Sequence, residues 1–224
     1  MYFCKKNISM ELIKKSFRDC TLTFMDKTFK MRQVETLNAL ETWLNEANEI
    51  TDFERQQLLY FQKKLKFNVH NWNEYELDTH FIGPVFTIVD FSSYDFNHFQ
   101  QRDFEGTVEN YHLSGKPDSM VASGRREPEM PYFAFQEYKK ELDPNGDPAG
   151  QALAAMLVAQ QMDENLKPMY GCYVVGSYWK FICLDIDRNY AISNPFDALS
   201  DELFDILRVL KNLKTIVQER VAKR

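Results

Sequence analysis

Apolar side chains recur every three or four residues in the first third of the chain, and this spacing is typical of amphipathic helices. The first such segment covers residues 33–48, where Val34, Leu37, Leu40 (or Ala39) and Leu44 follow the helical period before a polar, Asn-rich stretch. We therefore expect a helix over 33–48 that turns one apolar face toward a core.

Two further helices are predicted downstream. Thr51 begins the second, and Glu54 three residues later completes a capping-box pattern. The third begins at Asn73 and contains Pro84, where we expect a kink because proline cannot donate a backbone hydrogen bond. Ahead of all three, residues 20–31 (CTLTFMDKTFKM) favour a short hairpin.

After residue 95 the pattern changes from helical to extended. Residues 97–113 are polar and aromatic without helical periodicity, which indicates a long strand or a hairpin. Residues 114–117 (SGKP) have turn chemistry, and a short strand is expected over 118–122. A charged loop with two prolines spans 124–131, and residues 132–139 form a buried strand that ends in charge.

The last third alternates again between the two kinds of element. Pro148 suits the first turn of an Ala-rich helix over 149–165. Strands follow at 170–175 and 179–185, and Ser200 is expected to cap a final helix that runs to about residue 222. From the third helix onward the predicted order is α-β-β-β-α-β-β-α, which indicates an α/β fold with a mixed sheet.

Composition supports a folded protein of one large domain with an added part. The 224 residues are 44% hydrophobic and 27% charged, which is too apolar for a disordered tail. We divide the chain into a mainly helical N-terminal extension, 1–70, and a domain over 71–224. No apolar segment approaches the ~18 residues that span a bilayer, and the first residues lack a secretory apolar region. We therefore expect a cytoplasmic protein that does not bind membranes.

Charge and cysteine content narrow the chemistry. The net charge is −6 and the isoelectric point about 5.3, so any binding of nucleic acid must depend on a local basic surface. The cysteines, Cys4, Cys20, Cys172 and Cys183, form no CxxC pair, and the histidines lack metal-binding spacing. Buried free thiols are expected rather than a zinc site or a disulfide framework.

The strand over 132–139 offers the most suggestive chemistry. Side chains alternate between the two faces of a strand, so Phe133, Phe135, Glu137 and Lys139 are expected to share one face. A carboxylate and an ammonium group would then emerge side by side at the end of an apolar strand. The alternative is an ordinary solvated strand end.

A second carboxylate precedes this strand by 19 residues. If the strand that begins at Asp118 pairs with 132–139 as a hairpin, Asp118 and Glu137 converge and could bind one divalent cation. Mg²⁺ binds one or two carboxylates and fills its other positions with water and substrate phosphate. Lys139 could then orient a water molecule or offset charge on the attacked phosphate.

Three segments together resemble the PD-(D/E)XK nuclease superfamily, which has the restriction-endonuclease-like fold. They are GKPD at 115–118, FAFQEYK at 133–139 and GQALAAMLVAQQM at 150–162. The resemblance implies a metal-binding Asp118, an E-x-K strand with Glu137 and Lys139, and a following helix whose Gln151 faces the substrate.

The segment 72–89 resembles the first core helix of that superfamily, which often contributes another acid. On helical spacing we choose Glu74 over Glu76 for this role, because Glu74 aligns with the inward-facing Leu77 and Phe81. The resemblance extends from residue 72 to about residue 190 and implies an α-β-β-β-α-β core.

The function implied by the resemblance is metal-dependent hydrolysis of phosphodiester bonds in nucleic acid, with DNA expected ahead of RNA, Mg²⁺ as cofactor and Mn²⁺ as a substitute. Some members of the superfamily have lost catalysis. The alternative is therefore a non-catalytic module that binds nucleic acid or protein on a nuclease-like fold.

Basic residues gather around the expected site in the sequence. Lys116, Arg125, Arg126 and Lys140 could bind substrate phosphates if a metal ion neutralises the carboxylates. A mixed, solvated loop is the alternative.

The final helix carries a long apolar stripe. Its members recur at steps of three and four residues and are Leu203, Leu207, Leu210, Leu213, Val217 and Val221. Either this stripe packs on the chain's own core, or part of it pairs with a second copy and forms a homodimer.

Overall fold

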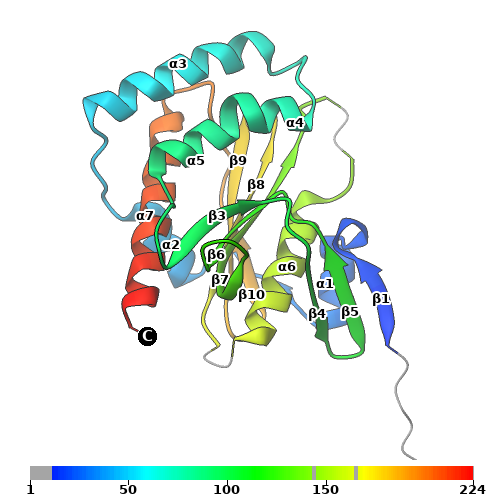
Figure 1. Cartoon of the computed structure of the whole chain (residues 1–224). Coiled ribbons are helices and arrows are strands. Elements are labelled where there is room, and N and C mark those ends of the chain that lie inside the picture. Colours follow the sequence, from blue (N-terminus) through cyan, green and yellow to red (C-terminus); the bar gives the residue numbers. More distant parts are fainter. Residues whose placement is uncertain (1–11, 143–144, 164–165, 224) are drawn as a thin grey trace, which may run out of the picture.

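The computed structural model describes residues 12–142, 145–163 and 166–223 (Figure 1). Cys4, which was among the expected free thiols, lies outside these ranges. The chain is an α/β protein in which a large mixed sheet carries helices on both faces, with a small sheet beside it (Figure 1). No helix within the described residues is long and apolar enough to cross a membrane.

The large sheet has the strand order β2-β10-β9-β8-β7-β6-β3, and β11 pairs separately with β9. Its strands are β2 (Arg32–Gln33), β3 (Phe96–Gln100), β6 (Ser119–Ser123), β7 (Glu129–Lys139), β8 (Met169–Val175), β9 (Tyr178–Leu184), β10 (Asn189–Ile192) and β11 (Phe196–Asp197). Neighbours are antiparallel except for the parallel pairs β7–β8 and β10–β2.

The small sheet has the order β1-β5-β4 and combines distant parts of the sequence. Its strands are β1 (Ile13–Ser16), β4 (Phe104–Val108) and β5 (Tyr111–Gly115). Since β1 pairs with β5 and β2 pairs with β10, both strands of the N-terminal region are built into sheets formed with later segments.

Helices cover the two faces of the large sheet and create two separate apolar cores. One core contains residues from α2 (Asn38–Asn45), α3 (Asp52–Asn68), α5 (Gly83–Val89) and α7 (Glu202–Ala222). The other contains residues from α1 (Leu22–Phe29) and α6 (Pro148–Met162). The short elements η1 (Phe17–Asp19), α4 (Glu74–Leu77) and η2 (Asp78–Ile82) complete the chain.

Helix α6 lies between the two sheets, in contact with β7 and β8 on one side and β4 and β5 on the other (Figure 1). Its residues from Ala149 to Gln160 are all buried. A helix buried on every side has no need of a polar face, which explains the run of alanines and other apolar residues. The expected helix over 149–165 thus ends at Met162, and residues 164 and 165 lie outside the described part of the chain.

The hairpin expected over residues 20–31 is wrong, because this segment forms α1. The hydroxyl of Thr21 accepts a hydrogen bond from the amide of Phe24 and caps the helix. Met25 and Phe29, one turn apart, are both buried against the core. Over so short a segment the apolar residues also fit the alternation of a strand. Burial of Met25 and Phe29 in the core favours the helix instead.

The other N-terminal helices are present with changed bounds. The expected helix over 33–48 is shorter than predicted. Its first residue, Gln33, belongs to β2, and the helix α2 covers only Asn38–Asn45. The capping box between Thr51 and Glu54 is confirmed at the start of α3, and Asn73 caps α4. The expected kink before Pro84 takes the form of a π-helical turn, η2, between α4 and α5.

The expected strands are present, with differences. The segment 97–113 forms three strands, β3, β4 and β5, rather than one strand or one hairpin. Strand β7 begins at Glu129, three residues earlier than expected, and β10 and β11 were not expected.

A β-bulge in β7 corrects the expected facing of its side chains. Val121 pairs with Ala134 but the next residue, Ala122, pairs with Tyr132, so Phe133 is the extra residue. Phe133 therefore packs in the core with Ala134 instead of sharing the face of Phe135. Beyond the bulge the alternation resumes, and Phe135, Glu137 and Lys139 share a face as expected.

The apolar stripe of the last helix packs within the chain itself. Leu203, Leu207, Leu210, Leu213 and Val217 are buried in the core with α2, α3 and α5, and Val221 packs against it. The helix begins at Glu202, whose amide donates to the hydroxyl of Ser200, so the expected capping contact is present although Asp201 occupies the capping position.

Candidate active site

The hairpin of β6 and β7 brings Asp118 and Glu137 together. Ser119 pairs with Gln136, so Asp118, one residue before β6, lies beside Glu137 near the end of β7. One carboxylate oxygen of Asp118 (Oδ2) accepts a hydrogen bond from the backbone amide of Tyr138 at 2.6 Å. The other (Oδ1) accepts one from Nε2 of Gln101 at 2.8 Å. Two donors from different segments thus fix the orientation of the Asp118 carboxylate.

A buried polar network on the other face of the hairpin holds the two strands in register. The hydroxyl of Ser119 donates to Oε1 of Gln136 at 2.6 Å and shares a hydrogen bond with the Tyr138 hydroxyl at 2.7 Å. All three side chains are buried. Because a buried polar group costs free energy when it lacks a partner, this network favours the one register that satisfies all three.

The two carboxylates line a pocket of about 370 Å³, which we call the carboxylate pocket. Its lining residues are Ser16, Phe17, Arg18, Glu74, Gly115, Lys116, Asp118, Glu137, Lys139, Asn145 and Gln151. The five expected catalytic residues, Asp118, Glu137, Lys139, Glu74 and Gln151, are all among them. Five separate segments of the chain therefore meet at this pocket.

Glu137 is the buried carboxyl of the pocket, and the partly buried carboxyl of Asp118 lies close to it. Glu137 is only 5% exposed. Burial raises its pKa well above the usual range, and the neighbouring Asp118 raises it further, while Lys139 opposes the change. Burial also raises the pKa of Asp118, against the lowering effect of its hydrogen bond from Tyr138. The carboxyl of Glu137 also shares a hydrogen bond with that of Asp118.

Lys139 provides the positive charge closest to these carboxyls. Its side chain is 10% exposed, and Nζ lies 4.0 Å from Oε2 of Glu137 and 3.8 Å from Oε1 of Glu74. The ammonium of Lys139 therefore lies among three carboxyls, and the pocket lining balances these acids with three cations, Lys139, Arg18 and Lys116. This arrangement differs from a solvated strand end, in which Glu and Lys would extend into water.

Helix α4 supplies Glu74 and uses Glu76 differently. The carboxylate of Glu76 accepts a hydrogen bond from the backbone amide of Asn73 at 2.9 Å and completes a capping box. Glu76 is thereby engaged at the helix end, whereas Glu74 lines the carboxylate pocket. The structure thus places at the pocket the acid chosen on helical spacing.

The first turn of α6 supplies Gln151. Asp147 caps this helix by accepting from the amide of Gly150 at 3.0 Å, and its other oxygen accepts from the amide of Leu22 at 2.8 Å. A Cβ on Gly150 would lie 2.6 Å from backbone atoms of Cys20 and Thr21, so only glycine permits this close approach. The Nε2 atom of Gln151 is shielded from solvent and has no hydrogen-bond partner among the described residues.

Several residues at the site carry no signal in the sequence. Ser16 and Arg18 come from the N-terminal region, about 100 residues before Asp118, and no motif marked them. Gln101 follows β3, and its hydrogen bond to Asp118 depends on a pairing of β3 with β6 that had not been predicted. Asn145 lies in a loop without a recognisable signal.

Of the four expected basic residues, only Lys116 lines the carboxylate pocket. Lys116 pairs with the exposed Asp103 at 3.4 Å. Arg125 and Arg126 follow β6 at the end away from Asp118, and the five residues of β6 extend about 16 Å. The guanidinium of Arg125 stacks over Tyr94 there, 5.2 Å from the ring centre. Lys140 is half-buried and does not line the pocket.

The donor set of the carboxylate pocket fits a hard divalent cation. Mg²⁺ requires only oxygen ligands and takes one or two carboxylates from the protein. Asp118 and Glu137 offer such a pair, and a cation between them would replace the proton that their close approach favours. Within the described ranges, no group of three or more His, Cys, Asp or Glu side chains could hold a metal ion.

Comparison with models of known protein families and with curated proteins finds no match for this chain.

Proposed function

We propose that the chain is a metal-dependent nuclease that hydrolyses phosphodiester bonds of DNA on a restriction-endonuclease-like fold. The observation that carries this proposal is the close carboxyl pair of buried Glu137 and partly buried Asp118, with Nζ of Lys139 4.0 Å from Glu137, in a pocket lined by three further segments. Buried charges of this kind stabilise a fold weakly or not at all, so a role in binding or chemistry explains them better.

The arrangement of elements supports the fold proposal. A helical segment (α4, η2 and α5) precedes the hairpin of β6 and β7, and α6 and the parallel strand β8 follow it. This succession agrees with the core order that the sequence resemblance implies. Strands β4 and β5 are an insertion into that order, and they cover the outer side of α6.

Asp118 and Glu137 are the residues that would hold Mg²⁺ or Mn²⁺. A cation bound there supplies charge stabilisation for the attacked phosphate and lowers the pKa of a bound water. The role of Gln101 and the Tyr138 amide is to keep the Asp118 carboxylate oriented before the cation arrives.

Lys139 then acts on the substrate and the attacking water. Its ammonium donates hydrogen bonds to a water molecule or to a phosphate oxygen and stabilises the negative charge that develops there. Glu74, 3.8 Å from the same ammonium, keeps Lys139 directed into the pocket.

The remaining groups bind the phosphate backbone. Arg18 and Lys116 are cations at the pocket, and the unpartnered amide of Gln151 can donate to a phosphate or sugar oxygen. These few cations, rather than the acidic surface as a whole, supply the local attraction for nucleic acid.

The test is cleavage of single- and double-stranded DNA with Mg²⁺ or Mn²⁺. We expect cleavage that a chelator abolishes. Asp118→Asn should reduce it at least a hundredfold, which is the usual cost of removing one electrostatic group from a catalytic site. The matched control is Asp187→Asn, which changes an exposed carboxylate away from the pocket and should cleave like the native chain. Absence of metal-dependent cleavage by the folded native chain, or equal cleavage by Asp118→Asn, would overturn the proposal.

A further inference from the structure

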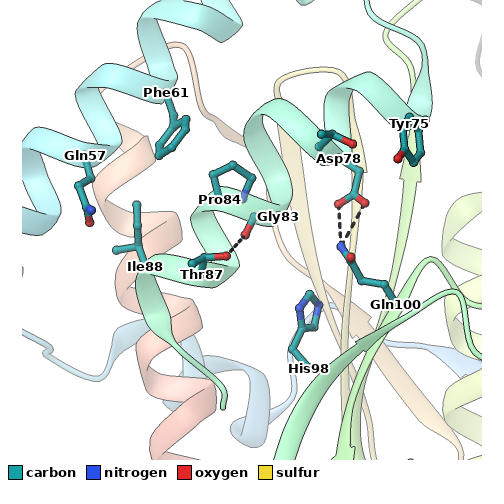
Figure 2. Close-up of a pocket in the computed structure, with 11 residues that line it drawn as sticks. Gln57, Phe61, Tyr75, Asp78, Gly83, Pro84, Thr87, Ile88, His98 and Gln100 are labelled. Carbon is teal, nitrogen blue, oxygen red and sulfur yellow. Dashed lines mark hydrogen bonds between the residues drawn. The ribbon is translucent and has the colours of Figure 1, made fainter. Parts of the chain in front are cut away.

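A second cavity of about 570 Å³ lies beside the carboxylate pocket, between α3, the α4–α5 segment and strand β3 (Figure 2). This volume is within the range of about 300–1,000 Å³ that is typical of small-molecule sites. The lining combines apolar groups such as Pro84 and Phe61 with polar groups, among them Gln57 at one end and Asp78 with Gln100 at the other (Figure 2). We call it the side cavity.

Asp78 and Gln100 place a hydrogen-bond acceptor and a donor next to each other at one end of the cavity. Nε2 of Gln100 donates to the two carboxylate oxygens of Asp78 at 3.3 and 3.1 Å, as the dashed lines in Figure 2 mark. The longer distance exceeds the usual range of about 2.7–3.2 Å, and the contact is exposed to solvent, so a ligand can compete for both groups. The cavity wall thus presents two acceptor oxygens beside an amide donor.

The floor of the cavity carries a polar atom without a partner. The Nε2 atom of His98 is shielded from solvent and makes no hydrogen bond within the described residues. Its ring stacks on Phe86 with a centroid distance of 4.4 Å, and Figure 2 shows it directed toward the space between the drawn residues. A buried nitrogen in this state costs free energy unless a ligand or water satisfies it.

An aromatic side chain marks the open end. Tyr75 is 77% exposed, beside Asp78 in Figure 2. The exposed ring leaves its apolar faces in contact with water, and a nucleobase that stacks on such a ring would cover one of them.

The side cavity and the carboxylate pocket are adjacent through two connections. The amide of Asp78 donates to the carbonyl of Glu74, so residues of the two sites are one helical turn apart. Gln100 lines the side cavity, and the next residue, Gln101, binds the Asp118 carboxylate at 2.8 Å. A nucleotide joined to a phosphate in the carboxylate pocket could therefore reach the side cavity with its base.

We propose that the side cavity binds a guanine base of the DNA strand whose phosphate occupies the carboxylate pocket. Guanine alone among the four bases presents two adjacent N–H donors (N1–H and the 2-amino group) beside an acceptor (O6) on its Watson–Crick edge. The two oxygens of Asp78 match the donors, the amide of Gln100 matches O6, and Tyr75 provides the stacking surface. This inference rests on the proposed nuclease function and adds a base preference to it.

The experiment measures binding and cleavage separately. Fluorescence anisotropy gives the affinity of the Lys139→Ala chain for thymidine oligonucleotides that carry one central guanine, hypoxanthine, adenine or cytosine. Hypoxanthine lacks only the 2-amino group, so it isolates one of the two donors. We expect about tenfold tighter binding of the guanine strand than of the other three, which is the usual discrimination of a bidentate contact.

Asp78→Asn, combined with Lys139→Ala, should remove the preference, because an amide offers only one acceptor. The matched control is Asp90→Asn, at a position of positive φ outside the side cavity that asparagine tolerates, and it should keep the preference. Equal affinity for all four strands, or a guanine preference that survives Asp78→Asn, would overturn the guanine site.

Cleavage of the same strands by the native chain with Mg²⁺ separates this inference from the proposed function. Metal-dependent cleavage without base discrimination keeps the nuclease and overturns the guanine site. Guanine preference that depends on Asp78, in a chain that does not cleave, keeps the site and overturns the nuclease.

Discussion

Backbone geometry positions Lys139 and the two carboxylates, Glu137 and Asp118, that would hold the cation. The alternation of β7 directs Glu137 and Lys139 to one face, and the Tyr138 amide between them binds Asp118. In the proposed site Asp118 and Glu137 bind the metal ion, whereas Lys139 stabilises the reacting groups. Substitutions can therefore separate the two roles.

Lys139→Ala tests this separation. The two carboxylates remain, so Mn²⁺ binding measured by calorimetry should stay close to that of the native chain, while DNA cleavage falls about a hundredfold or more. Glu137→Gln should instead weaken Mn²⁺ binding. The control is Lys140→Ala, which removes the adjacent lysine outside the pocket. Loss of Mn²⁺ binding in a folded Lys139→Ala chain would show that the assigned role is wrong.

His98 makes the stability of the protein depend on pH. Burial lowers the pKa of this imidazole from 6.5 to about 4. As the pH falls below 6.5, the unfolded chain takes up a proton there and the folded chain does not until about pH 4, so the free energy of unfolding decreases. From the size of this shift, the loss attributable to His98 between pH 7 and pH 5 is about 2 kcal/mol.

His98→Phe keeps an aromatic ring against Phe86 and removes the titration. Urea unfolding at pH 7 and pH 5 should therefore show a smaller loss of stability for the variant than for the native chain, by about 2 kcal/mol. An equal loss in both would contradict the assignment of the acid sensitivity to His98.

The junction of α1 and α6 positions Gln151 through a close backbone contact. Gly150→Ala would place a Cβ 2.6 Å from backbone atoms of Cys20 and Thr21 and force the two helices apart. We expect thermal unfolding to show a loss of about 1–3 kcal/mol, the usual cost of overpacking, together with reduced cleavage. Unchanged stability would show that the junction is looser than the geometry indicates.

Much of this architecture could be predicted from local patterns. The capping box at Thr51 and Glu54, the start of α4 at Asn73 and the pairing of β6 with β7 all follow from short-range chemistry or strand alternation. The α1 helix and the bulge at Phe133 could not, because each depends on which core the neighbouring side chains enter.

The same limit applies to the site. The site residues on the β6–β7 hairpin, on α4 and on α6 could be predicted because they lie in short sequence patterns with a regular spacing. Arg18 and Gln101 reach the site only through contacts between distant segments, the pairing of β1 with β5 and of β3 with β6. Arg125 was near in sequence but lies beyond the far end of β6, since an extended strand moves the chain away quickly.

The packing of α7 bears on the oligomeric state. Its apolar stripe is covered by α2, α3 and α5, and buried Asn212 joins it to α2 through hydrogen bonds to the carbonyls of Trp43 and Glu46 at 2.8 and 2.9 Å. Little of the stripe is left to pair with a second copy.

We therefore predict a monomer of 26.5 kDa in light scattering at micromolar concentration. Leu210→Glu, which places a charge in the core, should lower stability without changing the mass of the folded fraction. A mass of about twice the monomer that Leu210→Glu reduces to one chain would instead support a homodimer through α7.

One divalent cation held between Asp118 and Glu137 is the centre of the proposed nuclease site. All other assignments, from Lys139 to the side cavity, are made relative to that position. A crystal structure of the native chain soaked with Mn²⁺, with anomalous diffraction to locate the ion, tests it directly. We predict an anomalous peak about 2.1 Å from oxygens of both Asp118 and Glu137. Well-ordered carboxylates with no ion between them, or an ion bound elsewhere in a crystal of protein that cleaves DNA, would contradict the account.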